Sequence, residues 1–197
     1  MFYEQKIQDY LKKSGGIITN SDCINENIPT VYLSRMTKKG LLFRYCCGVY
    51  ITDDCDYDEF YFYQYRFKKA IYSYETALYL LGESDALDPR IEVSVNEGYK
   101  FNNNQKNIIV HYVKNEWYNL GIVETKTMYG NIVKVYCYER VICDFIKNRK
   151  NIDSETYVKA ICSYKKYNKR DLDALYEIAE KMKILNKVIE LMELVYE

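Results

Sequence analysis

The sequence predicts an α+β protein, in which a small N-terminal module precedes a second domain of helices around a sheet of about four strands. Apolar residues recur at helical spacing near both ends of the chain, while four runs between residues 91 and 137 have the length and composition of strands. Glycine or proline separates most of these segments. A length of 197 residues is enough for two small domains, each with its own core.

Composition excludes several classes of protein. A hydrophobic content of 48% and a charged content of 28% are ordinary for a folded domain. No apolar run approaches the ~20 residues of a membrane span, and the N-terminus does not resemble a signal peptide, so we expect a cytoplasmic protein without membrane contact. Seven cysteines without a C-x-x-C motif, and one histidine, predict neither a disulfide framework nor a metal site.

The N-terminal module begins with an amphipathic helix that ends at Gly15-Gly16. Ile17-Ile18 can form a short strand, and the pattern from Thr19 to Asp22 predicts a capping box at the start of a second helix, which buries Cys23 or Ile24. The apolar positions of the first helix are Tyr3, Ile7, Tyr10 and Leu11.

A third helix and a hairpin complete this module. Pro29 fits the first position of the third helix, and Gly40 fits the left-handed position after its end. Residues 41–45 and 48–52 then read as two strands around a glycine-containing turn. Three helices followed by a hairpin are the order of a winged helix-turn-helix, which we expect over residues 1–52.

The third helix carries the functional hypothesis. Leu33 and Met36 share a face that should pack on the first two helices, with the apolar contact continuing to Leu41. The other side is short, polar and basic, which suits a DNA major groove, although any small helical unit with a solvated basic face has this pattern. On this side, which includes Val31, Arg35 could pair with a guanine while Thr30 and Ser34 read base edges. Phosphates would be held by Lys38, Lys39 and Arg44.

Charge is unevenly distributed along the chain. The formal net charge is zero, but residues 1–52 hold seven basic and four acidic residues, which leaves +3. Residues 53–59 then read DDCDYDE, with five acids in seven positions. A basic module is therefore followed by an acidic junction, so the zero net charge of the chain does not exclude DNA binding by the module.

The second domain is expected over residues 58–197. A helix at 58–71 is followed by one that Ser73 caps and that buries Ala77, Leu78 and Leu81. Strands are predicted at 91–96, 107–113, 120–127 and 131–137. Four apolar stripes predict the C-terminal helices, and their positions are Ile142, Phe145 and Ile146; Tyr157, Ala160, Ile161 and Tyr164; Leu172, Leu175, Ala179 and Met182; and Val188, Leu191, Met192 and Val195.

An enzymatic second domain is the alternative from another functional class. Glu124-Thr125-Lys126 is an E-x-K triplet that could serve a Mg²⁺-dependent nuclease together with Asp88, but alternation on a half-exposed strand is the favoured explanation. His111 lies in a predicted strand without an obvious acid partner. No phosphate-binding or nucleophile motif is present, so we expect no enzyme and no cofactor.

Five blocks together resemble the AbiEi antitoxins of type IV toxin–antitoxin (abortive infection) systems. They are GGIITNSDC, IPTVYLSRMTKKGLLFRYCCGVYI, YQYRFKKAIYSYETALYLLG, IEVSVNEGY and MYGNIVKVYCYERVICDFI, in this order across nearly the full chain. The resemblance implies an N-terminal winged helix-turn-helix that represses the antitoxin–toxin operon by binding inverted repeats in its promoter. It also implies an antitoxin domain that counters a nucleotidyltransferase-like toxin, by direct contact or indirectly.

The resemblance also bears on individual residues. The family often places Arg or Lys in the wing turn, where this chain has Tyr45-Cys46-Cys47, so we expect weaker electrostatic contact between wing and DNA. Arg140 and Asp144 are spaced for an ion pair within one helix. Arg35, Lys38, Lys39 and Arg44 lie on the matching DNA-binding blocks, and the candidates in the antitoxin domain are Tyr138, Glu139, Arg140 and Asp144.

Two further interpretations stay open beside the antitoxin. The chain could be a winged-helix transcription regulator with an unrelated effector domain, or, with less support, a metal-dependent DNA-processing enzyme. Self-association on repeated half-sites is compatible with the first two interpretations, because one asymmetric module reads each half of an inverted repeat.

Overall fold

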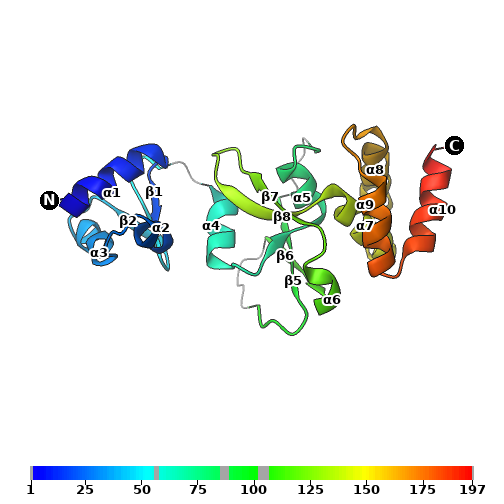
Figure 1. Ribbon diagram of the computed structural model, residues 1–197, viewed down its shortest axis with the longest axis horizontal. Helices are drawn as coiled ribbons and strands as arrows, with labels where there is room; N and C mark the ends of the chain where they lie inside the picture. The colour runs from blue at the N-terminus through cyan, green and yellow to red at the C-terminus, as the bar shows by residue number, and fades with distance from the viewer. Residues whose placement is uncertain (1, 56–57, 85–88, 102–106, 197) are drawn as a thin grey trace. The chain divides into compact units, whose positions relative to one another are not determined.

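A computed structural model describes residues 2–55, 58–84, 89–101 and 107–196 (Figure 1). The chain divides into two compact units, Met1–Arg66 and Phe67–Glu197. Helices accompany a three-stranded sheet in the first unit and a five-stranded sheet in the second. The α+β class that the sequence predicts is therefore confirmed.

The described residues of the first unit form four helices and three strands. β3 lies at the centre of its sheet and pairs antiparallel with β1 on one side and β2 on the other. The sequence predicted every element except the last as part of this module. In chain order they are α1 (Phe2–Lys13), β1 (Ile17–Thr19), α2 (Asn20–Asn25), α3 (Val31–Lys38), β2 (Phe43–Cys46), β3 (Val49–Ile51) and α4 (Glu59–Arg66).

The core of the first unit joins α1, α2 and α3 to the sheet. Cys23 is fully buried and Ile24 is exposed, which decides between the two residues expected to anchor α2. The predicted contact at Leu41 is wrong, because Leu41 is 47% exposed while Leu42 is 1% exposed and occupies the core. The buried cluster comprises Ile7, Leu11, Ile18, Cys23, Ile28, Leu33, Met36, Leu42 and Tyr50.

The start of α2 confirms the predicted capping box. The Thr19 hydroxyl accepts a hydrogen bond from the backbone N–H of Asp22 at 3.1 Å, and the Asp22 carboxylate accepts one from the backbone N–H of Thr19 at 2.8 Å. Two N–H groups that the first turn leaves without helical partners are thereby satisfied. The short connection from β1 to α2 is fixed by this pair.

The start of α3 differs from the expectation for Pro29. The helix begins at Val31 with Thr30 as its N-cap, so Pro29 precedes the helix instead of occupying its first position. The Pro29 carbonyl accepts a hydrogen bond from the Tyr32 N–H at 3.1 Å, which places Pro29 in the turn that leads into the helix. Gly40, with a φ of +71°, follows the helix end as predicted.

Helix α4 ends earlier than predicted and packs with the first unit. The sequence placed a helix at 58–71 in the second domain, but α4 ends at Arg66. Phe62 of α4 is 2% exposed and forms a second core cluster with Ile17 and Val49, so the first compact unit extends beyond the predicted end at residue 52.

The second unit is built on a five-stranded mixed sheet with the order β6-β5-β4-β8-β7. The four predicted strands are all present. The central strand β4 was predicted as the end of a helix, and it is extended because Ile71 pairs with Ser94 while Tyr72 pairs with both Val93 and Val135. The strands are β4 (Ile71–Tyr72), β5 (Ile91–Asn96), β6 (Ile108–Val113), β7 (Ile122–Lys126) and β8 (Ile132–Tyr136).

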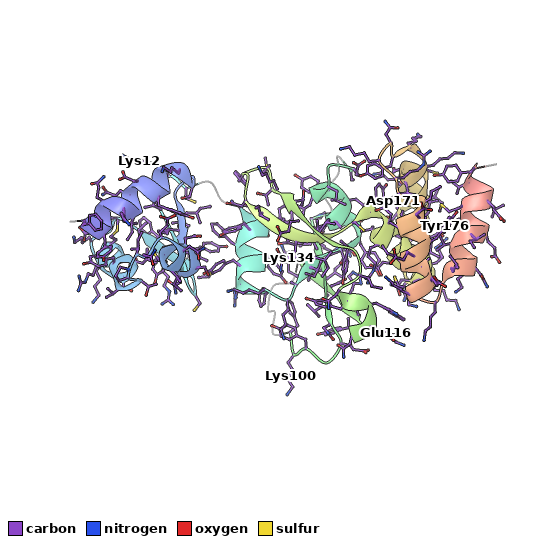
Figure 2. The ribbon with its side chains drawn as sticks, viewed as in Figure 1. Lys12, Lys100, Glu116, Lys134, Asp171 and Tyr176 are labelled. Atoms are coloured by element: carbon purple, nitrogen blue, oxygen red, sulfur yellow. The ribbon has the colours of Figure 1, made fainter. Side chains whose placement is uncertain are left out.

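Helices pack against this sheet and continue to the C-terminal end. α7 is buried from Tyr138 to Ile146 and contacts α5, α8 and α9. Asp153 and Asp171 accept hydrogen bonds from the first turns of α8 and α9, and Asp171 is labelled at the start of α9 in Figure 2. The helices are α5 (Tyr74–Leu80), α6 (Asn115–Tyr118), α7 (Tyr138–Lys147), α8 (Ser154–Lys166), α9 (Leu172–Lys181) and α10 (Leu185–Tyr196), with a 3₁₀ turn η1 (Arg149–Asn151).

Two global expectations can be compared with the structure. The seven cysteines all lie within the described residues, and none of them is in a disulfide bond. Among the described helices, none has both the length and the apolar character that crossing a bilayer requires.

Replacement of Thr19 by Ala should destabilise the protein by about 1 kcal/mol, because the N–H of Asp22 loses its capping acceptor. Urea unfolding followed by circular dichroism measures this change. Ser21→Ala, at an exposed position of the same helix, is the matched control and should have a smaller effect. Equal free energies of unfolding for the two variants would contradict the role of the capping box.

Candidate nucleic-acid interface

Helix α3 presents a polar and basic side to solvent. Leu33 and Met36, at 0% and 1% exposure, hold the opposite side against the core. Because a helix turns about 100° per residue, these two contacts direct the remaining positions outward. The residues expected to contact DNA are all exposed, namely Thr30, Val31, Ser34, Arg35, Lys38, Lys39 and Arg44.

Arg35 is held over an aromatic ring of its own helix. Its guanidinium carbon lies 5.0 Å from the centroid of the Tyr32 ring, and the Tyr32 ring packs at 5.1 Å on Tyr3 of α1. A cation over a ring face within about 6 Å is attracted by the ring quadrupole. The stack restricts the guanidinium plane, and the donors at its edge can still pair with a guanine or a phosphate.

Lys39 is paired within the unit. Its Nζ lies 2.5 Å from the Glu4 carboxylate, which joins the end of α3 to α1. The hydrogen bond from Lys39 holds the pKa of Glu4 below its ordinary value. Lys38, one position earlier, makes no ion pair among the described residues. Of the two neighbouring lysines, Lys38 is therefore better suited to contact a phosphate.

The hairpin of β2 and β3 is anchored at its turn. Gly48, with a φ of +81°, accepts hydrogen bonds through its carbonyl from the Asn20 N–H and from the Tyr65 hydroxyl. The Tyr45 ring stacks on Phe62 of α4 at 4.4 Å. Arg44 is exposed on β2, whereas the turn itself contributes Cys47 and no cation. Tyr45 thus contributes aromatic surface to this hairpin, and Arg44 contributes its charge.

The candidate residues of the second unit lie inside the protein. Arg140 is fully buried, with its Nε donating to the Asp144 carboxylate at 3.1 Å. This confirms the ion pair that the spacing predicts. The Arg140 Nη1 also donates to the backbone carbonyls of Trp117 and Leu120. The side chain therefore binds the segment around α6 to α7.

Glu139 and Tyr138 connect α7 to the helices on its other side. The Glu139 carboxylate accepts hydrogen bonds from the Asp171 N–H at 3.1 Å and from the Tyr164 hydroxyl at 3.4 Å. The Tyr138 hydroxyl donates to the Ala160 carbonyl at 3.3 Å. Because Tyr138, Glu139, Arg140 and Asp144 are all buried, they can position the surface of this unit but do not themselves form one.

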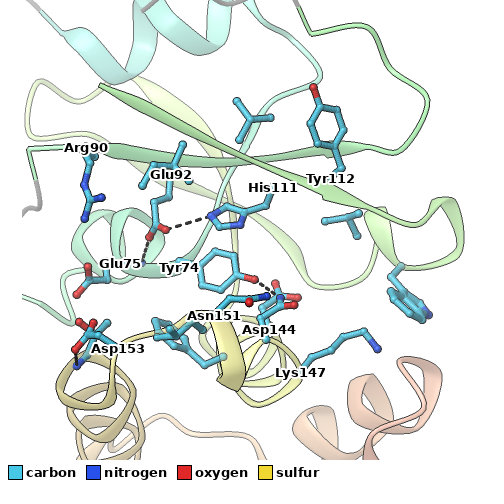
Figure 3. Close-up of a pocket in the computed structure, with 18 of the residues that line it drawn as sticks. Tyr74, Glu75, Arg90, Glu92, His111, Tyr112, Asp144, Lys147, Asn151 and Asp153 are labelled. Carbon is cyan, nitrogen blue, oxygen red and sulfur yellow. Dashed lines mark hydrogen bonds and ion pairs between the residues drawn. The ribbon is translucent and has the colours of Figure 1, made fainter. Parts of the chain in front are cut away.

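The expectation that His111 lacks an acid partner is wrong. Its Nε2 lies 3.1 Å from the Glu92 carboxylate, and its ring packs on Tyr74 at 4.1 Å (Figure 3). Glu92 is on β5 beside β6, and the same carboxylate accepts the Glu75 N–H at 3.0 Å. The sequence alone could not predict this pair, because it depends on the parallel register of β5 and β6.

His111 and Tyr74 line a pocket of about 810 Å³ in the second unit (Figure 3). Tyr74 has a φ of +49°, a left-handed conformation that costs about 1–3 kcal/mol for a residue of this kind. Its ring also packs on Phe145, and its hydroxyl accepts a hydrogen bond from Asn148. The pocket has the size of a small-molecule site, and two of the five carboxylates that line it, Glu92 and Asp144, already have partners within the unit.

The residues of the nuclease hypothesis do not assemble into a metal site in the described part of the chain. Glu124 and Lys126 share the exposed side of edge strand β7, and Glu124 pairs across the ladder with Lys134. Asp88 lies outside the described residues. No group of three or more acidic, histidine or cysteine side chains suited to a metal occurs among the residues described.

Comparison with known proteins agrees with the prediction for the N-terminal module. Residues 5–51 match the family model of the transcriptional regulator, AbiEi antitoxin. The fold is similar to that of the crystal structure of the RV2827C protein from Mycobacterium tuberculosis, with a TM-score of 0.55 and 9% identity over 95% of this chain and 77% of that chain. No curated protein matches the sequence. The predicted AbiEi resemblance is thus supported where the family model applies, at residues 5–51.

The Glu4 carboxyl should titrate below 4.5, because the Lys39 ammonium stabilises its ionised form. A lowered folded-state pKa means that the stabilisation by this pair is present above the ordinary pKa and is lost as pH falls through the lowered one. NMR titration of the Glu4 side chain measures it. Lys39→Ala should return the midpoint toward 4.5, and an unchanged midpoint would show that the two side chains do not interact.

Asp144→Leu should destabilise the protein by about 3–5 kcal/mol, since it leaves the Arg140 guanidinium buried without its counter-ion. In a double-mutant cycle with Arg140→Met, the two changes should be coupled by about 0.5–3 kcal/mol. Urea unfolding of the four proteins measures both quantities. Additive effects would mean that the carbonyl contacts of Arg140, and not Asp144, hold α7 in place.

Proposed function

We propose that this protein is a DNA-binding antitoxin that represses its own operon. In this proposal the N-terminal module is a winged helix-turn-helix that binds inverted repeats in the promoter, with α3 in the major groove. The second unit, which includes residues 67–197, counters a nucleotidyltransferase-like toxin encoded beside it. The match of residues 5–51 to the AbiEi antitoxin regulators carries this proposal.

The surface of α3 supports a DNA-binding role on physical grounds. Arg35 and Ser34 are exposed on a helix whose other side is fixed by the core, and the stack on Tyr32 limits the rotamers of Arg35 before DNA arrives. Less side-chain entropy is then lost when Arg35 pairs with a guanine. Lys38 and Arg44 lie to the side and can hold phosphates, which sets the register without reading sequence.

Two copies on one operator follow from the asymmetry of the module. A single α3 surface can read one half-site, so an inverted repeat takes two copies related by a two-fold axis. We therefore expect two modules for each operator, with self-association on DNA where repeats are adjacent. The Cys46-Cys47 turn contributes little electrostatic attraction, so the affinity of each module depends mainly on α3 and Arg44.

A regulator that senses a small molecule is the second candidate function, and the pocket lined by Tyr74 and His111 favours it. In that case the second unit would bind an effector and would not protect against a toxin. Expression of the adjacent gene with and without this protein distinguishes the two functions. Growth arrest that this protein relieves supports the antitoxin, whereas an innocuous neighbour supports the regulator.

Arg35→Ala should weaken binding to the operator by about 1–3 kcal/mol if the guanidinium reads a base, and it should relax preference for the operator over unrelated DNA. Lys38→Ala should weaken both kinds of binding and reduce the slope of log affinity against log salt by about 1. Mobility-shift titrations at several salt concentrations measure these changes.

The matched control for this experiment is Lys159→Ala, at an exposed position of α8 in the second unit. It removes the same charge from the chain and should leave operator binding unchanged. Unchanged affinity in the Arg35 and Lys38 variants would place the DNA-binding surface outside α3.

A further inference from the structure

A groove of about 520 Å³ lies in the second unit between the end of α7, the turn η1 and helix α10. Tyr157 of α8 also contributes to its wall. None of the residues considered above as DNA-binding or antitoxin candidates lines it, and it is separate in its lining from the interface on α3. Its side chains combine an excess of positive charge with exposed apolar surface.

The rim of the groove is strongly cationic. Lys147, Arg149, Lys150 and Lys187 line it against the single acid Glu190. Lys150 and Lys187 are exposed and make no ion pair among the described residues. Burial first, and then the charges of Lys114 and Lys187, lower the pKa of Lys147. Like charges held this close repel one another, so an anion bound between them is stabilised.

One of these cations is already fixed in place. The Arg149 Nη1 donates to the Ile152 carbonyl at 3.1 Å, and its Nη2 donates to the Ser154 hydroxyl at 3.0 Å. Its guanidinium also lies 4.5 Å from the centroid of the Tyr157 ring. The wall on this side is therefore rigid before binding, which reduces the entropy lost when a ligand is held there.

The other wall of the groove is apolar. Leu194 of α10 is 73% exposed, and Leu191, one turn earlier, is partly exposed. Ile146 of α7 is buried beneath them. A row of apolar side chains beside cations resembles the grooves that receive one face of an amphipathic segment. A nucleic-acid backbone would use the cations but would leave the leucines in contact with water.

We propose that this groove binds an acidic segment of a partner protein, with apolar side chains against Leu191 and Leu194 and carboxylates against Lys150 and Lys187. The choice of occupant rests on charge complementarity, since Arg149, Lys150 and Lys187 line the groove against the single acid Glu190. The ammonium of the fourth cation, Lys147, is held by the Met182 carbonyl and the Trp117 ring. The identification of that partner with a toxin rests on the proposed function of the second unit. The groove itself does not depend on that function.

The experiment uses the full chain and a fluorescent synthetic peptide. In this peptide, Leu recurs at helical spacing on one face and Glu occupies the other positions. Fluorescence anisotropy measures its binding to the native protein and to Lys150→Glu/Lys187→Glu and Leu194→Asp variants. Each change removes a contact and the first also introduces repulsion, so both should weaken binding, the charge reversal by about tenfold or more. A peptide with Lys in place of Glu should not bind.

Lys166→Glu/Lys169→Glu is the matched control, because it makes the same charge change at exposed positions outside the groove. At a salt concentration that screens the change in net charge, this control should bind the peptide with the affinity of the native protein. Loss of acidic-peptide binding in the control as well, or no binding by the native protein, overturns the proposal. Binding of single-stranded or duplex DNA that depends on Lys150 and Lys187 would also overturn it, in favour of a nucleic-acid site.

The failure of this proposal is distinguishable from failure of the proposed function. Operator binding by the groove variants reports on α3, and relief of growth arrest reports on antitoxicity. Groove variants that lose the peptide but retain operator affinity assign the defect to the second unit. A toxin that the native protein captures equally well in all variants shows that the groove is not where the partner binds.

Discussion

Burial of Leu33 and Met36 beneath α3 is the contact on which the first unit depends. These side chains settle in the core between α1, α2 and the sheet, and their position fixes the rotation of α3 about its own axis. Arg35 and Lys38 are directed to solvent for that reason, not because of any preference of their own. The Lys39–Glu4 pair then ties the C-terminal end of α3 to α1.

In the second unit, buried polar side chains fix the orientation of helix α7. α7 is buried from Tyr138 to Ile146, so its side chains contact other elements on every side of the helix. Arg140 reaches toward α6 while Glu139 reaches toward α9, so one helix is fixed against two layers by charged side chains in addition to apolar packing. The polar residues of α7 that suggested a functional site therefore hold the fold together. The pocket beside His111 and the groove beside α10 are concave surfaces of this unit that lie outside those contacts.

Local sequence patterns predicted most of the first unit and less of the second. The capping box at Thr19 and Asp22 depends on residues three apart, so it was readable directly. β4 was not, because Ile71 continues a helical pattern, and Ile71 and Tyr72 become a strand only through pairing with residues far along the chain. The same limit applies to the candidate sites. The exposure of α3 follows from its own periodicity, whereas the His111–Glu92 pair requires the register of two parallel strands, and the groove requires residues from α7 and α10.

The central position of the short strand β4 has a consequence for the order of events during synthesis. Its two residues join the β5–β6 half of the sheet to the β7–β8 half, so the sheet cannot close until the ribosome has delivered Val135. Pairing across such separations is slow, because loop closure must precede it. The first unit closes from contacts within its own 66 residues and can fold while the remainder is still emerging. If the two units have the roles proposed, a nascent chain gains the capacity to bind its operator before it can protect the cell.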